Sequence, residues 1–544
     1  MGTIGVILFM LTAVVLSGVL VRAIPLAVPT PLVQIALGAA IAAGSSHRVE
    51  LDPEVFFFLF LPPLLFLDGW RIPKEGLLRD RGMILELALG LVIFTVLGMG
   101  LFIHWLIPAV PFGVAFALAA IVSPTDPVAV SAISARSPIP KRIMHVLEGE
   151  SLLNDASGLV CFRFAVAAVL TGTFSLHDAT LTFLQLVIAG VLIGIALTLV
   201  VMNGKAWLTQ KLGEDSGSQV LVSLLIPFAA YELAEQFGGS GILAAVSAGI
   251  TMSYAELSGR ALASTRVQRT AVWDTVQFAL NGIMFVLLGE QLPHIFSGAI
   301  EAVQQSNHDN PWWLAVYVIA INLGLASLRF LWVWVSVRVT YSLAKRRMQV
   351  LPHQPGWRLI AAMSVAGVRG AITLAGVLTL PLALADGSEF PARDLIIFLA
   401  AGVIILSLTA ASVLLPHLLE GLHLPSESAE DEEIDRARVI ASKAAIRAVE
   451  EASHEMASGH SDADVYADAA TRVMDTYRRR LEGHLTGENH MRARRANAIE
   501  RKLRLAAIRA ERETLFDLAR SKKISDGKSR LLIRELDLIE ERLS

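Results

Sequence analysis

Residues 147–163 read L-E-G-E-S-L-L-N-D-A-S-G-L-V-C-F-R and lie inside a longer apolar run. Within this stretch Glu148, Glu150, Asp155 and Arg163 carry ionisable side chains. A charged group in the hydrocarbon core of a membrane is costly, and residues of this kind mark ion pathways. The stretch therefore predicts a membrane-spanning helix that carries an ion, with the rest of the chain arranged as a scaffold around it.

The composition indicates a membrane protein with a soluble extension. Of the 544 residues, 54% are hydrophobic and only 17% are charged, which is too apolar for an ordinary soluble enzyme. Charged residues are sparse up to about residue 424 and dense after it. We therefore expect a membrane domain over 1–424 and a cytoplasmic helical domain with a regulatory role over 425–544. The net charge of −3 indicates nothing about partners.

The N-terminus is expected to be a retained first transmembrane helix. It lacks the basic region of a signal peptide, because the first basic residue, Arg22, follows the apolar run. The single cysteine, Cys161, can form no intrachain disulfide and belongs to no zinc pattern. No cofactor is expected.

Apolar segments long enough to span a membrane recur along the chain. Two of them, 28–44 and 240–254, are short, so twelve spans are an alternative to thirteen. The thirteen candidates are 3–22, 28–44, 54–70, 82–107, 112–134, 143–171, 180–203, 217–236, 240–254, 271–292, 312–343, 357–384 and 393–420.

The charges of the connecting loops predict the orientation. The loops on one side carry most of the basic residues, and the opposite loops carry little beyond Arg48 and Arg393. The positive-inside rule places the basic loops in the cytoplasm, so thirteen spans put the N-terminus outside and the C-terminus inside. The basic residues concerned are Arg71, Lys74, Arg79, Arg81, Arg136, Lys141, Arg142, Lys205, Lys211, Arg260, Arg266, Arg269, Lys345, Arg346, Arg347 and Arg358.

Three spans contain helix-breaking residues: Pro62-Pro63, the sequence S-P-T-D-P at 123–127, and G-V-R-G at 367–370. Non-helical backbone at membrane depth is tolerated where it lines a cavity or is packed in protein. Interrupted segments in both halves of a chain indicate a transporter site built from inverted repeats.

The central helix offers oxygen ligands. Ser151 and Asp155 are four residues apart and share a helix face, and Glu150 and Asn154 share the adjacent face. Hydroxyl, amide and carboxylate oxygens suit hard cations such as sodium. The alternative for any one of these residues is a hydrogen bond between helices.

The broken segment adds Thr125 and Asp126, which could supply a hydroxyl, a carboxylate and freed carbonyls. A carboxylate removed from water holds its proton more tightly, and a bound cation expels that proton. Proton and cation then compete for one group, which is sufficient for exchange provided that the loaded site can face either side and the empty charged site cannot cross. Since Asn154 precedes Asp155, the carrier charge is one, and exchange of one proton for one monovalent cation would be electroneutral.

Other charges at membrane depth need partners. We expect Arg369 to pair with Glu150. Arg163 lies two turns beyond Asp155, so it either tunes that carboxyl group or pairs elsewhere. The charged residues to which the sequence assigns no partner are Arg163, Arg329, Glu86, Glu232 and Asp68.

After residue 424 the sequence is acidic at 427–435 and then shows four amphipathic helical patterns, over 434–456, 463–485, 492–520 and 528–543. Basic clusters at 478–480 and 492–495 either contact anionic lipid or form solvated helix faces. This part contains no phosphate-binding loop, metal motif or catalytic triad, and the sequence does not identify its partner.

Three motifs resemble the cation:proton antiporter 1 family of sodium/proton exchangers. They are S-P-T-D-P-V-A-V at 123–130, G-E-S-L-L-N-D-A-S-G at 149–158 and G-V-R-G-A-I-T-L-A at 367–375. The sequence at 511–527 is similar to the cytoplasmic extension of a bacterial subgroup. The resemblance implies an all-α homodimer in which each subunit has two inverted six-helix repeats, crossed broken helices and an elevator-like movement.

By motif match, Asp155 would carry the sodium ion or the proton, and Asn154 would support it. The other residues that the resemblance implies are Ser151, Thr125 and Asp126 as the lining of the site, and Glu150 and Arg369 as a structural ion pair. Many family members carry an acidic residue where this chain has Leu67. Asp68 follows one residue later, about 100° around the helix, so its place in the site is an open question.

The expected function is electroneutral sodium/proton exchange at the cell membrane, serving pH homeostasis, with membrane lipids as partners and with neither nucleic acid nor enzyme chemistry. Three alternatives remain: a potassium/proton antiporter of the same fold, an ion channel with a gating tail, and a membrane sensor whose tail signals. A single deep carboxylate suits alternating access better than a multi-site conduction path.

Overall fold

The computed structural model is predominantly helical in its described regions and contains no β-strand among them, which confirms the all-α prediction. The chain divides into two compact units, Met1–Leu422 and His423–Ser544. The predicted domain boundary after residue 424 lies outside the described residues. The described residues are 3–23, 28–44, 53–72, 81–126, 130, 141–172, 176–213, 215–256, 263–305, 310–346, 356–384, 387–420, 427–457, 463–482, 489–521, 523–524 and 526–543.

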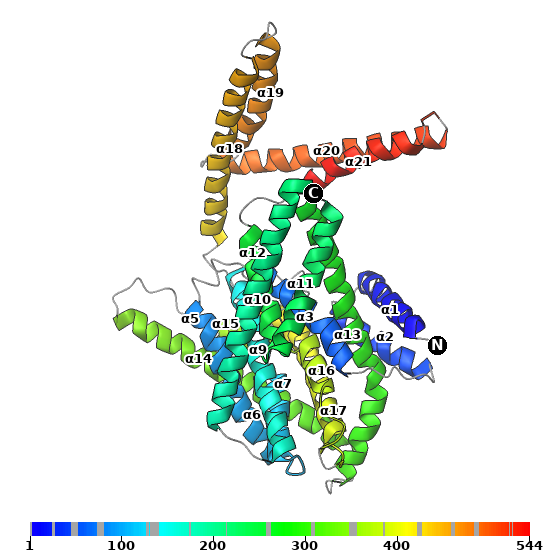
Figure 1. The fold of residues 1–544 in the computed structure, drawn as a ribbon, viewed down its shortest axis with the longest axis vertical. Helices are drawn as coiled ribbons and strands as arrows, with labels where there is room; N and C mark the ends of the chain where they lie inside the picture. The colour runs from blue at the N-terminus through cyan, green and yellow to red at the C-terminus, as the bar shows by residue number, and fades with distance from the viewer. Residues whose placement is uncertain are drawn as a thin grey trace. The chain divides into compact units, whose positions relative to one another are not determined.

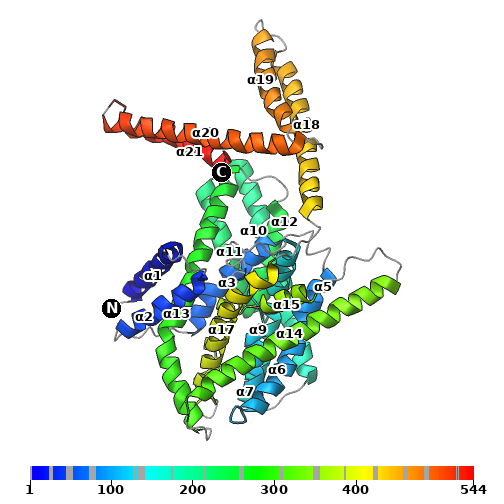
Figure 2. The same cartoon turned by 180° about the vertical axis from the view of Figure 1, so that it is seen from behind.

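The first unit has one to three helical segments at each of the thirteen predicted positions (Figures 1 and 2). Seven of the described helices are long and apolar enough to cross a membrane. The elements are α1 (Thr3–Ala23), α2 (Thr30–Gly44), α3 (Pro53–Arg71), α5 (Arg81–Leu85), η1 (Glu86–Leu91), α6 (Val92–Leu106), α7 (Phe112–Val122), α9 (Lys141–Thr171), α10 (Leu176–Leu212), α11 (Ser216–Gln236), α12 (Gly241–Glu256), α13 (Ala263–Gln305), α14 (Trp312–Arg346), α15 (Trp357–Val365), α16 (Ala371–Leu378) and α17 (Arg393–Leu419).

Glycines allow α2 to pack on α13 and α3 to pack on α12 with their backbones close together. A Cβ atom on Gly38 of α2 would lie 1.9 Å from the carbonyl oxygen of Val286, and one on Gly249 of α12 would lie 2.1 Å from that of Phe66. Small residues at membrane helix interfaces permit this approach. The contacts hold α3 and α13, which both line the site, against neighbouring helices.

Two of the three predicted interruptions are real breaks. The helix α7 ends at Val122, and α15 and α16 are separated by the non-helical residues 366–370. In contrast, α3 continues through Pro62 and Pro63, so the prediction of an interruption there is wrong. Prolines are tolerated in membrane helices because neighbouring groups satisfy the freed backbone.

The two breaks are hydrogen-bonded to each other. The backbone N–H of Asp126 donates to the carbonyl of Val368 at 2.7 Å, and Nε of Arg369 donates to the carbonyl of Val122 at 2.9 Å. Unwound backbone leaves polar groups that must be paired in an apolar interior. The first break therefore supplies an N–H donor for a carbonyl of the second break, and the second break supplies a guanidinium donor for a carbonyl at the end of α7.

The second unit consists of two helix pairs. The first pair is α18 (Glu427–Ala457) with α19 (Ala463–Glu482), and the second is α20 (Asn489–Arg520) with α21 (Asp526–Leu543). In the second pair Arg512 forms ion pairs with Asp537, at 2.9 Å, and with Glu540. Most side chains of the predicted basic clusters at 478–480 and 492–495 lie outside the described residues.

Candidate functional site

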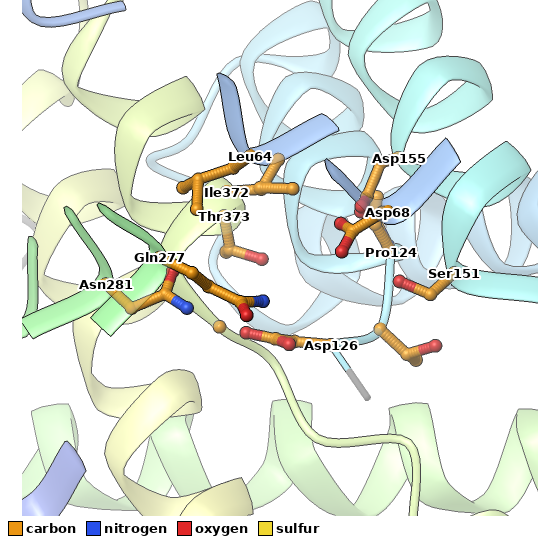
Figure 3. Close-up of a pocket in the computed structure, with 12 residues that line it drawn as sticks. Leu64, Asp68, Pro124, Asp126, Ser151, Asp155, Gln277, Asn281, Ile372 and Thr373 are labelled. Atoms are coloured by element: carbon orange, nitrogen blue, oxygen red, sulfur yellow. The ribbon is translucent and has the colours of Figure 1, made fainter. Parts of the chain in front are cut away.

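A cavity opens where the two breaks meet α3, α9 and α13 (Figure 3). Three carboxylates line it, each from a different segment: Asp68 from α3, Asp126 from the first break and Asp155 from α9. Ser151 and Thr125 add hydroxyl groups. The cavity thus gathers oxygen atoms from residues far apart in the sequence.

The spacing on α9 places two of the predicted ligands as expected. Ser151 and Asp155 both line the cavity, and their side chains are 3% and 4% exposed. The adjacent π-helical segment η1 is joined to α9 by Ser157, whose hydroxyl donates to the carbonyl of Ala88 at 2.7 Å. Bulges of this kind occur frequently at functional sites.

Beside the cavity, side chains form a chain of hydrogen bonds. Nδ2 of Asn154 donates to the hydroxyl of Thr125 at 3.0 Å, and that hydroxyl donates to Glu150 at 3.2 Å. Asn154 and Glu150 are each 1% exposed. The amide oxygen of Asn154 is buried and accepts no hydrogen bond from the described residues. Asn154 therefore orients Thr125 at the wall of the cavity, next to Asp155.

Glu150 pairs with Arg329 of α14. Nη1 and Nη2 of Arg329 donate to the two carboxylate oxygens at 2.5 and 2.7 Å, and Nε donates to the carbonyl of Met363 at 3.1 Å. The predicted pairing of Glu150 with Arg369 is therefore wrong. The bidentate fork of one arginine already occupies both oxygens of the carboxylate.

Arg369 instead binds the backbone of the broken helices. Its side chain donates to the carbonyls of Val122 and Gly367, and its backbone N–H donates to Ser407 at 3.2 Å. Carbonyl groups at the end of a broken helix carry partial negative charge. Arg369 thus links the two breaks, which is a structural role, although with partners other than the predicted one.

Asp68, rather than Leu67, faces the cavity. Asp68 lines it, whereas Leu67 is fully buried in an apolar cluster that includes Trp273 and Ile226. The helix α3 therefore brings a carboxylate to the site from the position after the one expected for the family.

The other predicted charges have partners elsewhere. Arg163 bonds Glu235 of α11, with Nη2 and Oε1 3.2 Å apart, so the structure supports the alternative in which it pairs away from Asp155. Glu232, which we expected to be buried, is exposed and accepts a hydrogen bond from Gln236 at 2.8 Å.

Two residues that the sequence analysis missed are Gln277 and Asn281 of α13. Both line the cavity, on the wall opposite Ser151 and Asp155 in Figure 3. They are four residues apart within a predicted span, so their amides share a helix face. This polar pair in an apolar segment was the signal that could have identified them.

The chemistry of the cavity suits a hard cation. Carboxylate, hydroxyl and amide oxygens surround it, and no sulfur atom is among the described lining residues. Across the described regions, no three His, Cys, Asp or Glu side chains lie close enough together to form a metal-binding cage. Asp155, Asp126 and Asp68 line one cavity without forming such a cage, so neutral oxygens would have to complete a cation site there.

Comparison with known proteins identifies the family. A family model described as "Sodium/hydrogen exchanger, transmembrane" matches residues 9–421. The chain is 40% identical over 542 residues to the uncharacterized Na(+)/H(+) exchanger YjcE of Escherichia coli (strain K12), covering 98% of this chain and 97% of that protein. It is also 40% identical over 520 residues to a "Sodium, potassium, lithium and rubidium/H(+) antiporter" of Bacillus pumilus (strain SAFR-032), covering 95% of this chain and 74% of that protein.

The fold is similar to that of the sodium proton antiporter MjNhaP1 from Methanocaldococcus jannaschii. The TM-score is 0.57 at 16% identity, and the match covers 77% of this chain and 98% of that structure. Sequence, fold and oxygen-lined cavity agree, and the chain belongs to the sodium/hydrogen exchanger family of integral membrane antiporters.

Proposed function

We propose that this protein exchanges sodium for protons across the cell membrane, and that Asp155 carries the cation or the proton in turn. The observation that carries the proposal is the meeting of Asp68, Asp126 and Asp155 in one cavity inside an apolar helical unit. Three carboxylates that share a small space repel one another when all are charged. A bound proton or a bound sodium ion relieves this repulsion, so the two compete.

The proposed exchange is electroneutral, with one proton for one sodium ion. Asn154, directly before Asp155, has a neutral amide that is bonded to Thr125, so it adds no second charge to the carrier. Glu150 is neutralised by Arg329. Asp68 and Asp126 keep their charge state in this scheme and hold the cation electrostatically.

We further propose an elevator-like movement of the crossed breaks and α9 relative to a scaffold that contains α3 and α13. The glycine contacts of α2 with α13 and of α3 with α12 support a rigid scaffold. The protein would act as a homodimer surrounded by lipid, with its N-terminus outside and its C-terminal unit in the cytoplasm as a regulatory domain. Its exchange would serve pH homeostasis.

A wider cation range is the second candidate. The Bacillus pumilus relative, 40% identical, is named as an antiporter of sodium, potassium, lithium and rubidium. The cavity here binds through oxygen atoms from several separate segments, and such a site can adapt to different ionic radii. Potassium/proton exchange by the same carboxylates is therefore the alternative.

Proton movement in sealed proteoliposomes tests the proposal. Wild type is expected to release protons from the lumen when sodium is added outside, and Asp155→Asn is expected to abolish this release. Asp215→Asn, in the exposed turn before α11, removes the same charge and serves as the matched control. A response to potassium alone would favour the alternative, and full activity of Asp155→Asn would refute Asp155 as the carrier.

A further inference from the structure

A charged cluster lies at the end of the cavity nearest the C-terminus of α3. Arg71, the last residue of α3, donates from Nη1 to Oε1 of Gln277 at 2.7 Å and forms an ion pair with Asp274 of α13. The side chains of Arg71 and Asp274 are 36% and 58% exposed. The cluster is therefore open to its surroundings, unlike the buried carboxylate of Asp155.

The same helix faces continue from this cluster into the cavity. On α3, Asp68 precedes Arg71 by three residues, and on α13 the positions 274, 277 and 281 follow one another at spacings of three and four. Residues at these spacings share one face of a helix. Asp68, Gln277 and Asn281 all line the cavity, so Gln277 belongs both to the cavity wall and to the charged cluster.

The arginine fixes the orientation of Gln277. A guanidinium group can only donate hydrogen bonds, so the atom of Gln277 that faces Arg71 must be the amide oxygen. That oxygen accepts a hydrogen bond from Arg71, and the NH2 group of the same amide is left as a donor. Arg71 thus restrains the side chain of Gln277, which also lines the cavity.

We propose that Arg71, Asp274 and Gln277 form the entrance through which the cation reaches the cavity from the side where α3 ends. This inference rests on the proposed cation/proton exchange and on its orientation, which make this the cytoplasmic side. A cation that enters here passes the positive charge of Arg71. Asp274 neutralises that charge, and Arg71 in turn holds Gln277 in place.

The entrance has a measurable consequence for binding. Replacing Asp274 with Asn leaves the charge of Arg71 uncompensated at the mouth of the cavity, while Asp155, Asp126 and Ser151 are unchanged. Repulsion between two like charges near a protein surface disfavours entry of the cation without changing the carrier. We expect the apparent KM for sodium on that side to rise about three- to tenfold, with the maximal rate within about twofold of wild type.

The test measures sodium-dependent proton movement in everted membrane vesicles, which present the cytoplasmic side, and in right-side-out vesicles. Asp274→Asn is expected to raise the KM only in everted vesicles. The double variant Arg71→Gln with Asp274→Asn removes both charges and is expected to return the KM to within about twofold of wild type. Asp215→Asn, which removes an acidic charge from an exposed turn elsewhere, is expected to leave the KM unchanged.

Each outcome bears on a definite claim. If wild type exchanges sodium and Asp274→Asn leaves the KM unchanged, the proposal of an entrance at Arg71 and Asp274 is refuted, whereas the proposed function stands. An equal rise on both sides, or a double variant as impaired as Asp274→Asn, also overturns it, because the pair would then act on the carrier site or on folding. Absence of sodium-dependent proton movement in wild type overturns the proposed function itself.

Discussion

The buried ion pair of Glu150 and Arg329 makes a quantitative prediction about stability. Replacing Glu150 with Gln keeps the shape of the side chain but leaves the guanidinium of Arg329, which is 3% exposed, without its counter-charge. The two N–O distances are 2.5 and 2.7 Å, and unit charges about 4 Å apart attract by about 4 kcal/mol at an effective dielectric constant of about 20. We expect E150Q to lower the free energy of unfolding by about 3–5 kcal/mol.

A double-mutant cycle separates this pair from the pair that the sequence suggested. The free energy of unfolding is measured in mixed detergent micelles for E150Q, R329Q, R369Q and the two double variants that contain E150Q. We expect a coupling energy of about 3 kcal/mol between Glu150 and Arg329, and of less than about 1 kcal/mol between Glu150 and Arg369. A stronger coupling to Arg369 than to Arg329 would refute the reasoning.

Two further predictions concern the backbone. Gly370→Ala would place a Cβ atom 1.6 Å from Oδ2 of Asp126, so we expect at least a tenfold loss of exchange in proteoliposomes, and wild-type activity in a folded variant would contradict this. The hydroxyl and the N–H of Ser218 donate to Asp215, which caps α11, and they lower the pKa of its carboxyl group. The charged form of the cap therefore adds stability at neutral pH, and this added stability is lost as pH falls below about 4. We expect Asp215→Ala, but much less Asp215→Asn, to speed amide hydrogen exchange in the first turn of α11 near neutral pH. The difference between Asp215→Ala and wild type is expected to decrease in acid, where the protonated carboxyl group caps only as a neutral acceptor.

The positions of the helices were largely predictable, because the signal is local. An apolar run of about twenty residues predicts a membrane helix without any knowledge of its neighbours. The helix α9 and its ligands Ser151 and Asp155 followed from one segment of sequence with a regular spacing. The breaks near Asp126 and Arg369 followed from the conformational properties of proline and glycine.

The partners of charged side chains were not predictable in this way. Glu150 and Arg329 are 179 residues apart, and their contact depends on how α9 packs against α14. Several arginines at membrane depth were candidate partners for Glu150. Arg369 was chosen because it lies in the second broken segment, within the motif at 367–375. The orientation of Asp68 depended on the rotation of α3 about its axis, which is set by its packing on α12 and by the burial of Leu67.

The hydrogen bond between the N–H of Asp126 and the carbonyl of Val368 connects two main chains, so no side chain is part of it. Every amino acid except proline supplies the same N–H group at position 126. A substitution at position 126 therefore keeps this link between the two breaks unless it introduces proline. The chemistry of the side chain at this position can thus change separately from the backbone contact that holds it beside the cavity.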